Sequence, residues 1–345
     1  MKNKKDLNLE LSTVKENLKR KLATNRILGD SGAVREIRRK VECLSACDVA
    51  VLIMGESGCG KEPAARGIHY LSARAGKPFV PVNCGAIPET LFENELFGHV
   101  KGAFTDAGFT QNGLVKEAEG GTLFLDEVGV ISPYIQVKLL RLLQEREYKP
   151  LGDSRYRCAE IRVIAATNEN LMGLVKKGTF REDLYYRLNI VSFHIPPLRE
   201  RKEDIPVLAN HFLKKYTARY SKTVQEFSSE AMEKLLSYEW PGNIRELENK
   251  VQQAIILTNR KTIRASDFQL GVGRPKPYTD SFKSFKEAKK KMVYSFEKNY
   301  LIQLLTRYNG DVVTAAANAG KSRTALWNLL TRHNLHPSQF SGNRI

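Results

Sequence analysis

Residues 55–62 combine glycines and a lysine in the segment that joins a strand to a helix. They follow the apolar run Val49 to Met54 and lead into a helical segment, an order that is typical of a phosphate-binding loop. Glycine lets several backbone N–H groups point at phosphate oxygens, and the helix N-terminus adds partial positive charge. Lys61 is then expected to reach the β and γ phosphates. The stretch alone also fits an ordinary glycine-rich turn. Its members are Gly55, Glu56, Ser57, Gly58, Cys59, Gly60, Lys61 and Glu62.

A second stretch, residues 120–127, supplies the carboxylates that a magnesium-bound nucleotide needs. It reads Gly-Gly-Thr-Leu-Phe-Leu-Asp-Glu, an apolar strand that ends in two acids. We expect Asp126 to hold Mg²⁺, directly or through water, and Glu127 to polarise the attacking water. Glu62 stands where such loops usually carry a Ser or Thr that ligates the metal, so the metal must depend on a carboxylate elsewhere. Together the two motifs disfavour the simpler interpretations, a turn and a solvent-facing carboxylate.

The composition indicates a protein of two or three domains without a membrane segment. The chain has 345 residues, of which 42% are hydrophobic and 27% are charged. No run approaches the roughly 20 apolar residues of a membrane span, and the Lys-rich start lacks the apolar stretch of a signal peptide. Five scattered cysteines give neither a disulfide framework nor a paired zinc spacing. We therefore expect a cytoplasmic protein that has no membrane partner.

The net charge of +17 is concentrated at the two ends of the chain. Residues 271–345 hold 13 Lys and Arg against 4 Asp and Glu, and residues 1–24 hold 7 against 3. A basic terminal segment indicates an anionic partner such as nucleic acid. Leucines among the charges of residues 1–24 suit an amphipathic helix from about Leu11 onward, which serves equally well as a linker, a dimer contact or a frayed tail.

Short apolar runs that alternate with helical stretches predict an α/β fold with a parallel sheet covered on both faces. The runs are Val49 to Met54, Phe79 to Val82, Thr122 to Leu125, Ile161 to Ala166 and Ile190 to Ile195. Ligands of such sheets bind beyond the carboxyl ends of the strands. Asn83, Asp126, Glu127 and Asn168 all follow strand ends and are expected to converge on one nucleotide. For either Asn, a strand-ending turn fits the spacing equally well.

The C-terminal residues read as helices. Phe285 to Arg307 predicts one long helix, with Ala288, Met292, Phe296, Tyr300 and Leu304 placed on one face. Two shorter helices joined at Gly320 predict a helix-turn-helix whose second helix, capped by Ser322, enters the major groove. Trp327 fits a DNA contact and a packing role equally well, and a small helical dimerisation module remains an alternative. The residues expected to meet bases or phosphates are Ser322, Arg323, Thr324, Asn328 and Arg332.

Several longer motifs carry a family resemblance. Residues 55–62, 95–99, 102–107, 120–127, 180–188 and 240–247 resemble, in order and spacing, the AAA+ domain of sigma-54-dependent transcriptional activators, the bacterial enhancer-binding proteins. The resemblance runs from about residue 27 to residue 269 and resumes near residue 285 with a Fis-type helix-turn-helix. It implies an AAA+ P-loop parallel sheet with a helical lid, followed by a small all-α domain. It also implies ATP and Mg²⁺ as cofactors and a ring, usually a hexamer, that remodels sigma-54 RNA polymerase.

The resemblance also assigns roles and boundaries. Arg181 and Arg187 match arginine fingers offered to the neighbouring subunit, although pairs such as Arg181 with Asp183 would otherwise suggest a surface helix. Asn168 matches a sensor residue, Arg245 the second sensor, and Asn83 the residue that holds Glu127. The implied segments are an N-terminal helix or linker (1–25), an α/β subdomain that contacts sigma-54 (26–200), a helical lid (201–270), a linker (271–284) and a helix-turn-helix domain that binds double-stranded DNA upstream of promoters (285–345).

The loop that contacts sigma-54 departs from the family at one residue. The family reads Gly-Ala-Phe-Thr-Gly-Ala, whereas this chain reads Gly102, Ala103, Phe104, Thr105, Asp106 and Ala107. Asp tolerates a left-handed backbone, so we expect the turn to survive and sigma-54 to be engaged. The rival function is an ATP-regulated DNA-binding regulator or repressor that does not engage sigma-54 because of Asp106.

Overall fold

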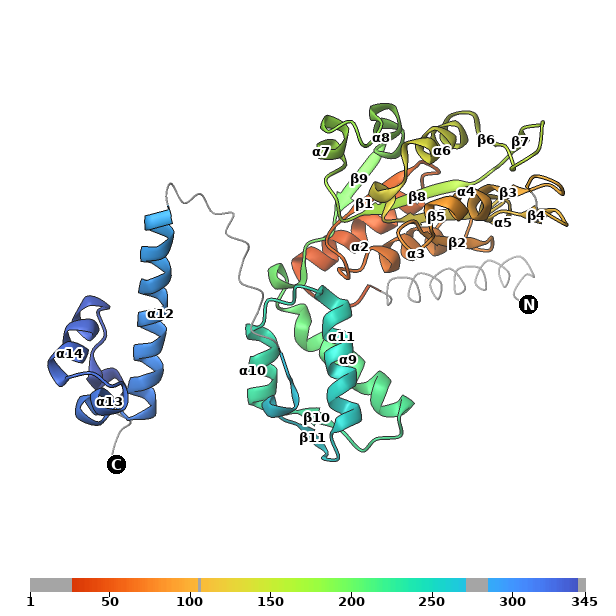
Figure 1. The fold of residues 1–345 in the computed structure, drawn as a ribbon. Helices are drawn as coiled ribbons and strands as arrows, with labels where there is room; N and C mark the ends of the chain where they lie inside the picture. The colour runs from red at the N-terminus through yellow and green to blue at the C-terminus, as the bar shows by residue number, and fades with distance from the viewer. Residues whose placement is uncertain (1–26, 105–106, 271–284, 341–345) are drawn as a thin grey trace, which may run out of the picture. The chain divides into compact units, whose positions relative to one another are not determined.

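The computed structural model describes residues 27–104, 107–270 and 285–340, and the chain divides into two units at residue 273 (Figure 1). The predicted N-terminal helix, the linker 271–284, and Thr105 with Asp106 lie outside the described residues. Among the helices that the structure describes, none is long and apolar enough to cross a bilayer.

The first unit is built on a five-stranded parallel sheet. Its strand order is β2-β5-β8-β1-β9, and each neighbouring pair is parallel. The five predicted apolar runs are thereby confirmed as the strands of an α/β fold. The strands are β1 (Val51–Met54), β2 (Phe79–Asn83), β5 (Thr122–Asp126), β8 (Arg162–Thr167) and β9 (Val191–His194).

Helices cover both faces of this sheet, because alternate residues of each strand point to opposite sides. In β1, Val51 and Ile53 pack in one core with α2 (Gly32–Ser45) and α3 (Lys61–Leu71), whereas Leu52 packs in the other. The elements around the second face are α4 (Glu89–Phe97), β3 (Gly98–His99), β4 (Gln111–Asn112), α5 (Leu114–Glu117), α6 (Pro133–Glu145), β6 (Glu147–Tyr148), β7 (Arg157–Cys158), α7 (Leu171–Lys176) and α8 (Glu182–Leu188).

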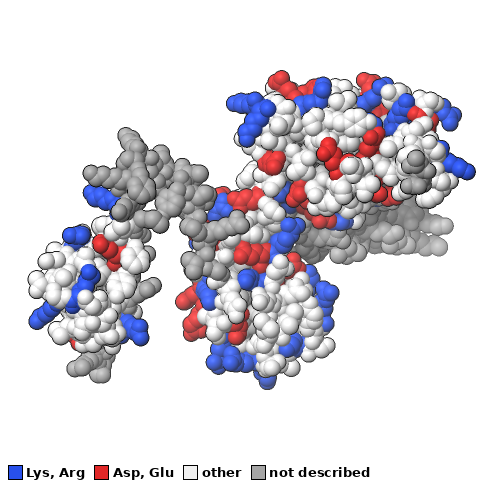
Figure 2. Space-filling model, in the orientation of Figure 1, with Lys and Arg blue, Asp and Glu red and all other residues white. Residues whose placement is uncertain are grey.

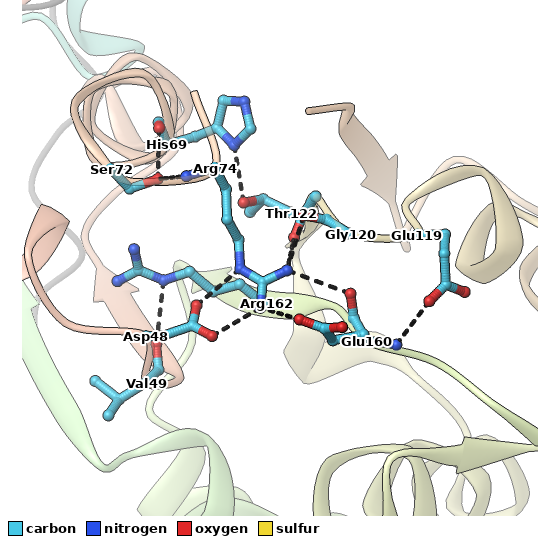
Figure 3. A network of polar contacts seen from close by, with 11 residues as sticks. Asp48, Val49, His69, Ser72, Arg74, Glu119, Gly120, Thr122, Glu160 and Arg162 are labelled. Atoms are coloured by element: carbon cyan, nitrogen blue, oxygen red, sulfur yellow. Dashed lines mark hydrogen bonds and ion pairs between the residues drawn. The ribbon is translucent and has the colours of Figure 1, made fainter. Parts of the chain in front are cut away.

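A polar network fastens the end of the sheet at which β5 and β8 begin (Figure 3). The Arg74 guanidinium donates to both carboxylate oxygens of Asp48 at 2.9 and 2.7 Å and to the carbonyl of Gly120 at 2.8 Å. The buried Arg162 donates to the carbonyl of Leu44 at 2.8 Å, which ties the end of α2 to β8. The buried Arg162 and the largely buried Arg74 thus have carbonyl and carboxylate acceptors. These hydrogen bonds offset the cost of removing the guanidinium groups from water.

The lid of the first unit is mostly helical and has its own core. Its helices are α9 (Asp204–Arg219), α10 (Ser229–Ser237) and α11 (Asn243–Leu257), and β10 (Glu226–Phe227) pairs in parallel with β11 (Thr262–Ile263). Trp240 is fully buried in this core, and its indole N–H donates to the carbonyl of Leu235 at 2.8 Å.

The second unit contains α12 (Phe285–Arg307), α13 (Val312–Asn318) and α14 (Arg323–Arg332). The long helix is confirmed, and so is the burial of Leu304, but the apolar face expected for it is wrong at Phe296 and Tyr300, while the side chains of Ala288 and Met292 lie outside the described part. Phe296 is 70% exposed and Tyr300 is 41% exposed, and the residues of α12 that enter the core are Leu301, Leu304 and Leu305. Residues spaced by four drift about 40° per step around a helix of 3.6 residues per turn, so such a row leaves the buried side.

Candidate nucleotide-binding site

The loop of residues 55–62, named the phosphate loop here, has the backbone that its glycines suggest. Gly55, Gly58 and Gly60 have φ values of 154°, 74° and 109°, and α3 begins at Lys61 directly after them. The buried Lys61 ammonium donates to the carbonyls of Gly55 at 2.9 Å and Glu56 at 3.0 Å. The lysine is therefore folded over the loop, within reach of an anion held by its N–H groups.

A cavity of about 330 Å³ lies against the phosphate loop. It draws its lining from the loop, from the ends of β2 and β5, and from the lid. Its size and mixed lining suit a small-molecule site. Among its lining residues are the following members of the predicted site: Ser57, Gly58, Cys59, Gly60, Lys61, Glu62, Asn83, Asp126, Glu127 and Arg245.

The two acids at the end of β5 differ in geometry. Asp126 is the last residue of the strand, and its carboxylate accepts the backbone N–H of Glu127 at 3.0 Å. Glu127 has a left-handed backbone, with φ 59° and ψ 42°. Strained conformations of this kind persist where the surrounding structure holds them, and they cluster at functional sites. The strain therefore supports a functional role for Glu127.

Asn83 stands beside Glu127, but it also stabilises a turn. Its Oδ1 accepts the backbone N–H groups of Gly85 at 2.9 Å and Ala86 at 3.2 Å. A Cβ atom added at Gly85 would lie 2.4 Å from a carboxylate oxygen of Glu127, so the turn and the carboxylate are close neighbours. The strand-ending turn that the sequence offered as an alternative role for Asn83 is therefore present. The Glu127 carboxylate lies next to this turn.

A carboxylate of the phosphate loop forms a bidentate contact with the start of the lid that the sequence analysis missed. Arg199 donates to both carboxylate oxygens of Glu56, at 2.6 and 2.8 Å, and Asn243 Nδ2 donates to the same carboxylate at 3.1 Å. These three residues are named the loop–lid contact. The hydrogen bonds from Arg199, more than those from Asn243, lower the pKa of Glu56. Its partners lie 143 and 187 residues away, which is why no local pattern reveals it.

Further hydrogen bonds join the lid to the same loop. The buried Arg201 donates to the carbonyl of Cys59 at 2.6 Å, and the N–H of Ile244 donates to the carbonyl of Gly58 at 3.0 Å. Arg245, which lines the cavity, donates to the hydroxyl of Ser57 at 3.2 Å. The lid is thus positioned directly on the phosphate loop.

Three predicted site residues lie away from this cavity. Arg181 is exposed at the start of α8 and donates to both carboxylate oxygens of Asp183, at 3.0 and 2.6 Å. Arg187 Nε donates to the carbonyl of Leu143 at 3.3 Å. Asn168 is exposed one residue beyond β8. The structure of a single chain therefore does not bring these side chains to the nucleotide side of the phosphate loop.

The described part of the loop 102–107 is held by backbone hydrogen bonds. The N–H of Gly102 donates to the carbonyl of Ala107 at 2.9 Å, which closes the loop at its base. The Phe104 side chain is 44% exposed, and its ring centroid lies 5.0 Å from that of His99. The N–H of Val100 donates to the carbonyl of Leu151 at 3.0 Å, so the β6–β7 hairpin supports this loop. The sequence interpretation missed that support.

Comparisons with known proteins agree with this geometry. Residues 27–194 match the Sigma-54 interaction domain, and residues 199–284 match the AAA+ ATPase lid domain. The transcriptional regulatory protein GlrR of Escherichia coli (strain K12) is 45% identical over 314 residues, which are 91% of this chain and 69% of GlrR. The chain belongs to the sigma-54-dependent AAA+ transcriptional regulators.

Two further comparisons agree with this family assignment. ZraR of Klebsiella oxytoca is 45% identical over 311 residues, which are 89% of this chain and 68% of ZraR. The crystal structure of NtrX from Brucella abortus in complex with ADP is 33% identical with a TM-score of 0.69, and it covers 95% of this chain and 74% of the NtrX chain. The protein is therefore an AAA+ ATPase that binds ATP, oligomerises and acts with sigma-54, and the relatives favour this activator function over a regulator that does not engage sigma-54.

Proposed function

We propose that the protein hydrolyses Mg²⁺-bound ATP between the subunits of a hexameric ring in the cytoplasm. Turnover moves residues 102–107 against sigma-54 RNA polymerase, while the second unit holds double-stranded DNA upstream of the promoter. One observation carries the proposal. The cavity gathers the phosphate loop, both strand-end acids and Arg245, whereas Arg181 and Arg187 lie outside it on the same chain.

The donor set of the cavity fits a magnesium ion that is completed by phosphate oxygens and water. Asp126 offers a carboxylate, and among the described residues no group of three or more His, Cys, Asp and Glu could form an all-protein metal site. Burial raises the pKa of Cys84 to about 12, and the negative charges of Asp126 and Glu127 act in the same direction. Asp126 would hold the ion, which would supply positive charge to the phosphates when bound.

The remaining roles follow from the positions of the side chains. The phosphate loop from Gly55 to Glu62 binds the phosphates, and Lys61 turns from its carbonyl partners to the β and γ phosphates. Glu127 orients the attacking water, held by the turn at Asn83. Arg245 contacts the nucleotide from the lid. Asn168, at the carboxyl end of the central strand β8, senses the γ phosphate.

Arg181 and Arg187 act on the neighbouring subunit's nucleotide. A guanidinium is always charged and stabilises the charge that develops during phosphoryl transfer. Arg181 is exposed and paired only locally with Asp183, a geometry from which it can reach across an interface. Supplying these groups in trans makes hydrolysis depend on ring assembly.

The contacts with macromolecules use the loop 102–107 and the second unit. Gly102, Ala103, Phe104, Thr105, Asp106 and Ala107 contact sigma-54, and the exposed Phe104 ring supplies the apolar grip. The residues of α14 and its cap that contact DNA are Ser322, Arg323, Thr324, Asn328 and Arg332, of which all are exposed.

Mixed rings test the trans arrangement. Glu127→Gln and Arg181→Ala should each abolish ATP hydrolysis, because one lacks the water-orienting group and the other lacks a finger. Mixed in equal amounts, they should recover roughly a quarter of the wild-type rate, since a quarter of random interfaces pair an intact glutamate with an intact finger. A mixture that stays inactive would show that Arg181 does not act in trans.

A trapped complex tests the sigma-54 contact separately. With ADP and aluminium fluoride as a mimic of the transition state, the wild-type protein should bind sigma-54, and so should Asp106→Gly. If only Asp106→Gly binds while both proteins hydrolyse ATP, the contact with sigma-54 proposed for residues 102–107 is wrong for the natural chain.

A further inference from the structure

The apolar side chain of Trp327 is unusually exposed to solvent. Its side chain is 51% exposed in the middle of α14, whereas the neighbouring Leu326 and Leu330 are 1% and 2% exposed. The indole therefore takes no part in the core of the second unit. Trp is enriched at interfaces, because a partner can cover its apolar ring while the indole N–H keeps a polar partner.

The surroundings of Trp327 are polar and basic. Arg323 lies one turn before it and Thr331 one turn after it, and both are exposed. The helix itself contains no Asp or Glu. On the face drawn in Figure 2, Lys and Arg predominate over Asp and Glu across the described part of this unit. The positive charge of this face favours an anionic partner. It disfavours a contact between two copies of α14, because neither copy offers an acidic residue.

We propose that Trp327 reads thymine in the major groove by packing its indole against the C5-methyl group. The inference rests on the proposed DNA binding by α14. The thymine methyl is the apolar feature of the major-groove edge, and apolar side chains recognise it. Asn328, the next exposed residue, can bond adenine through its amide. Trp327 thus favours a thymine, and Asn328 an adenine, among the base pairs that α14 contacts.

Uracil substitution tests the methyl contact directly. The full-length protein first selects duplexes from a randomised library, and each thymine of a selected duplex is then replaced by uracil, which removes only the methyl group. At the thymine that Trp327 contacts, the wild-type protein should bind about fourfold more weakly after the replacement, the value of one buried methyl group. Trp327→Ala should bind the thymine duplex more weakly and lose this difference.

Val313 provides the matched control. It is 57% exposed on α13, so Val313→Ala removes another exposed apolar side chain of the same unit. Val313→Ala should keep the difference between thymine and uracil. Equal discrimination by Trp327→Ala and by the wild type would overturn the inference. If no duplex is selected at all, the DNA-binding function fails and not merely the role of Trp327.

Fluorescence gives a second readout, because the chain has two tryptophans and Trp240 is fully buried. Acrylamide should quench mainly Trp327 in the free protein, and the selected duplex should protect it. Quenching that decreases as the protein concentration rises without DNA would place Trp327 between copies of the chain, and would overturn the inference.

Discussion

Arg199 donates two hydrogen bonds to the Glu56 carboxylate, at 2.6 and 2.8 Å, and so joins the second residue of the phosphate loop to the segment that enters the lid. Asn243 shares the same carboxylate and also donates to the carbonyl of Ser57 at 3.1 Å. Two charge-assisted bonds in one plane fix the orientation of both partners. The loop–lid contact therefore sets where Arg245 stands relative to the phosphates.

Removal of Arg199 should weaken nucleotide binding more than it weakens the fold. In Arg199→Ala we expect the KM for ATP to rise about tenfold, because the lid no longer holds Arg245 in place. The melting temperature should change little, since both partners of the pair are partly exposed and solvent screens their attraction.

Arg260→Ala is the control for this substitution, because Arg260 pairs with Asp267 on the lid surface at 3.7 Å. It should leave the KM unchanged. An Arg199→Ala protein with normal KM and lowered stability would show that the contact serves folding alone.

Arg74 should contribute mainly to stability. It is 12% exposed and serves a carboxylate and a carbonyl, so Arg74→Ala leaves both acceptors without their donor. We expect a loss of about 2 kcal/mol in the free energy of unfolding, measured by urea at pH 7. Unchanged KM for ATP in the folded variant would separate this end of the sheet from the nucleotide site.

Asp48 makes that stability depend on pH. The hydrogen bonds from Arg74 hold its pKa below the ordinary value of 3.8. A depressed pKa stabilises the folded state fully above pH 3.8, and the stabilisation disappears as the pH falls through the lower, folded-state value. The difference in melting temperature between the wild type and Asp48→Asn should therefore be constant above pH 5 and shrink below pH 3.8. A difference that stays constant below pH 3.8 would contradict the ion pair.

The sequence was sufficient to predict an element where its residue pattern has a single physical explanation. Buried parallel strands read as continuous apolar runs, so the sheet was predicted to within two residues at each strand. Asp126 and Asn83 follow such strands, and the structure places both in the cavity. The loop–lid contact was missed because Glu56 and Arg199 meet only after the whole sheet has formed. The buried face of α12 was misplaced because a spacing of four does not follow the helix.

Glu127→Gln should abolish hydrolysis and preserve ATP binding. The amide keeps the size of the side chain but cannot polarise water, and general-base groups contribute roughly 10²- to 10⁴-fold. The left-handed backbone at φ 59° belongs to the turn, so the fold should tolerate the change. Single-turnover hydrolysis and the Kd for ATP measure the two effects. A wild-type rate in the variant would remove Glu127 from the mechanism.

Gly152→Ala should uncouple ATP hydrolysis from the contact with sigma-54. Gly152 has φ 73°, and a Cβ atom there would lie 2.7 Å from Ala103, in the loop 102–107. The clash displaces that loop while the cavity of the phosphate loop stays intact. We expect near-normal ATP hydrolysis with loss of the aluminium-fluoride complex with sigma-54.

Gly178→Ala is the matched control for Gly152→Ala. Gly178 has the same φ of 73°, but a Cβ atom added there meets no atom within 4 Å. It carries the same backbone strain without the clash, so it should retain the sigma-54 complex. Loss of the complex in both variants would attribute the effect to strain or stability. Its loss in Gly152→Ala alone would show that the β6–β7 hairpin positions the loop that contacts sigma-54.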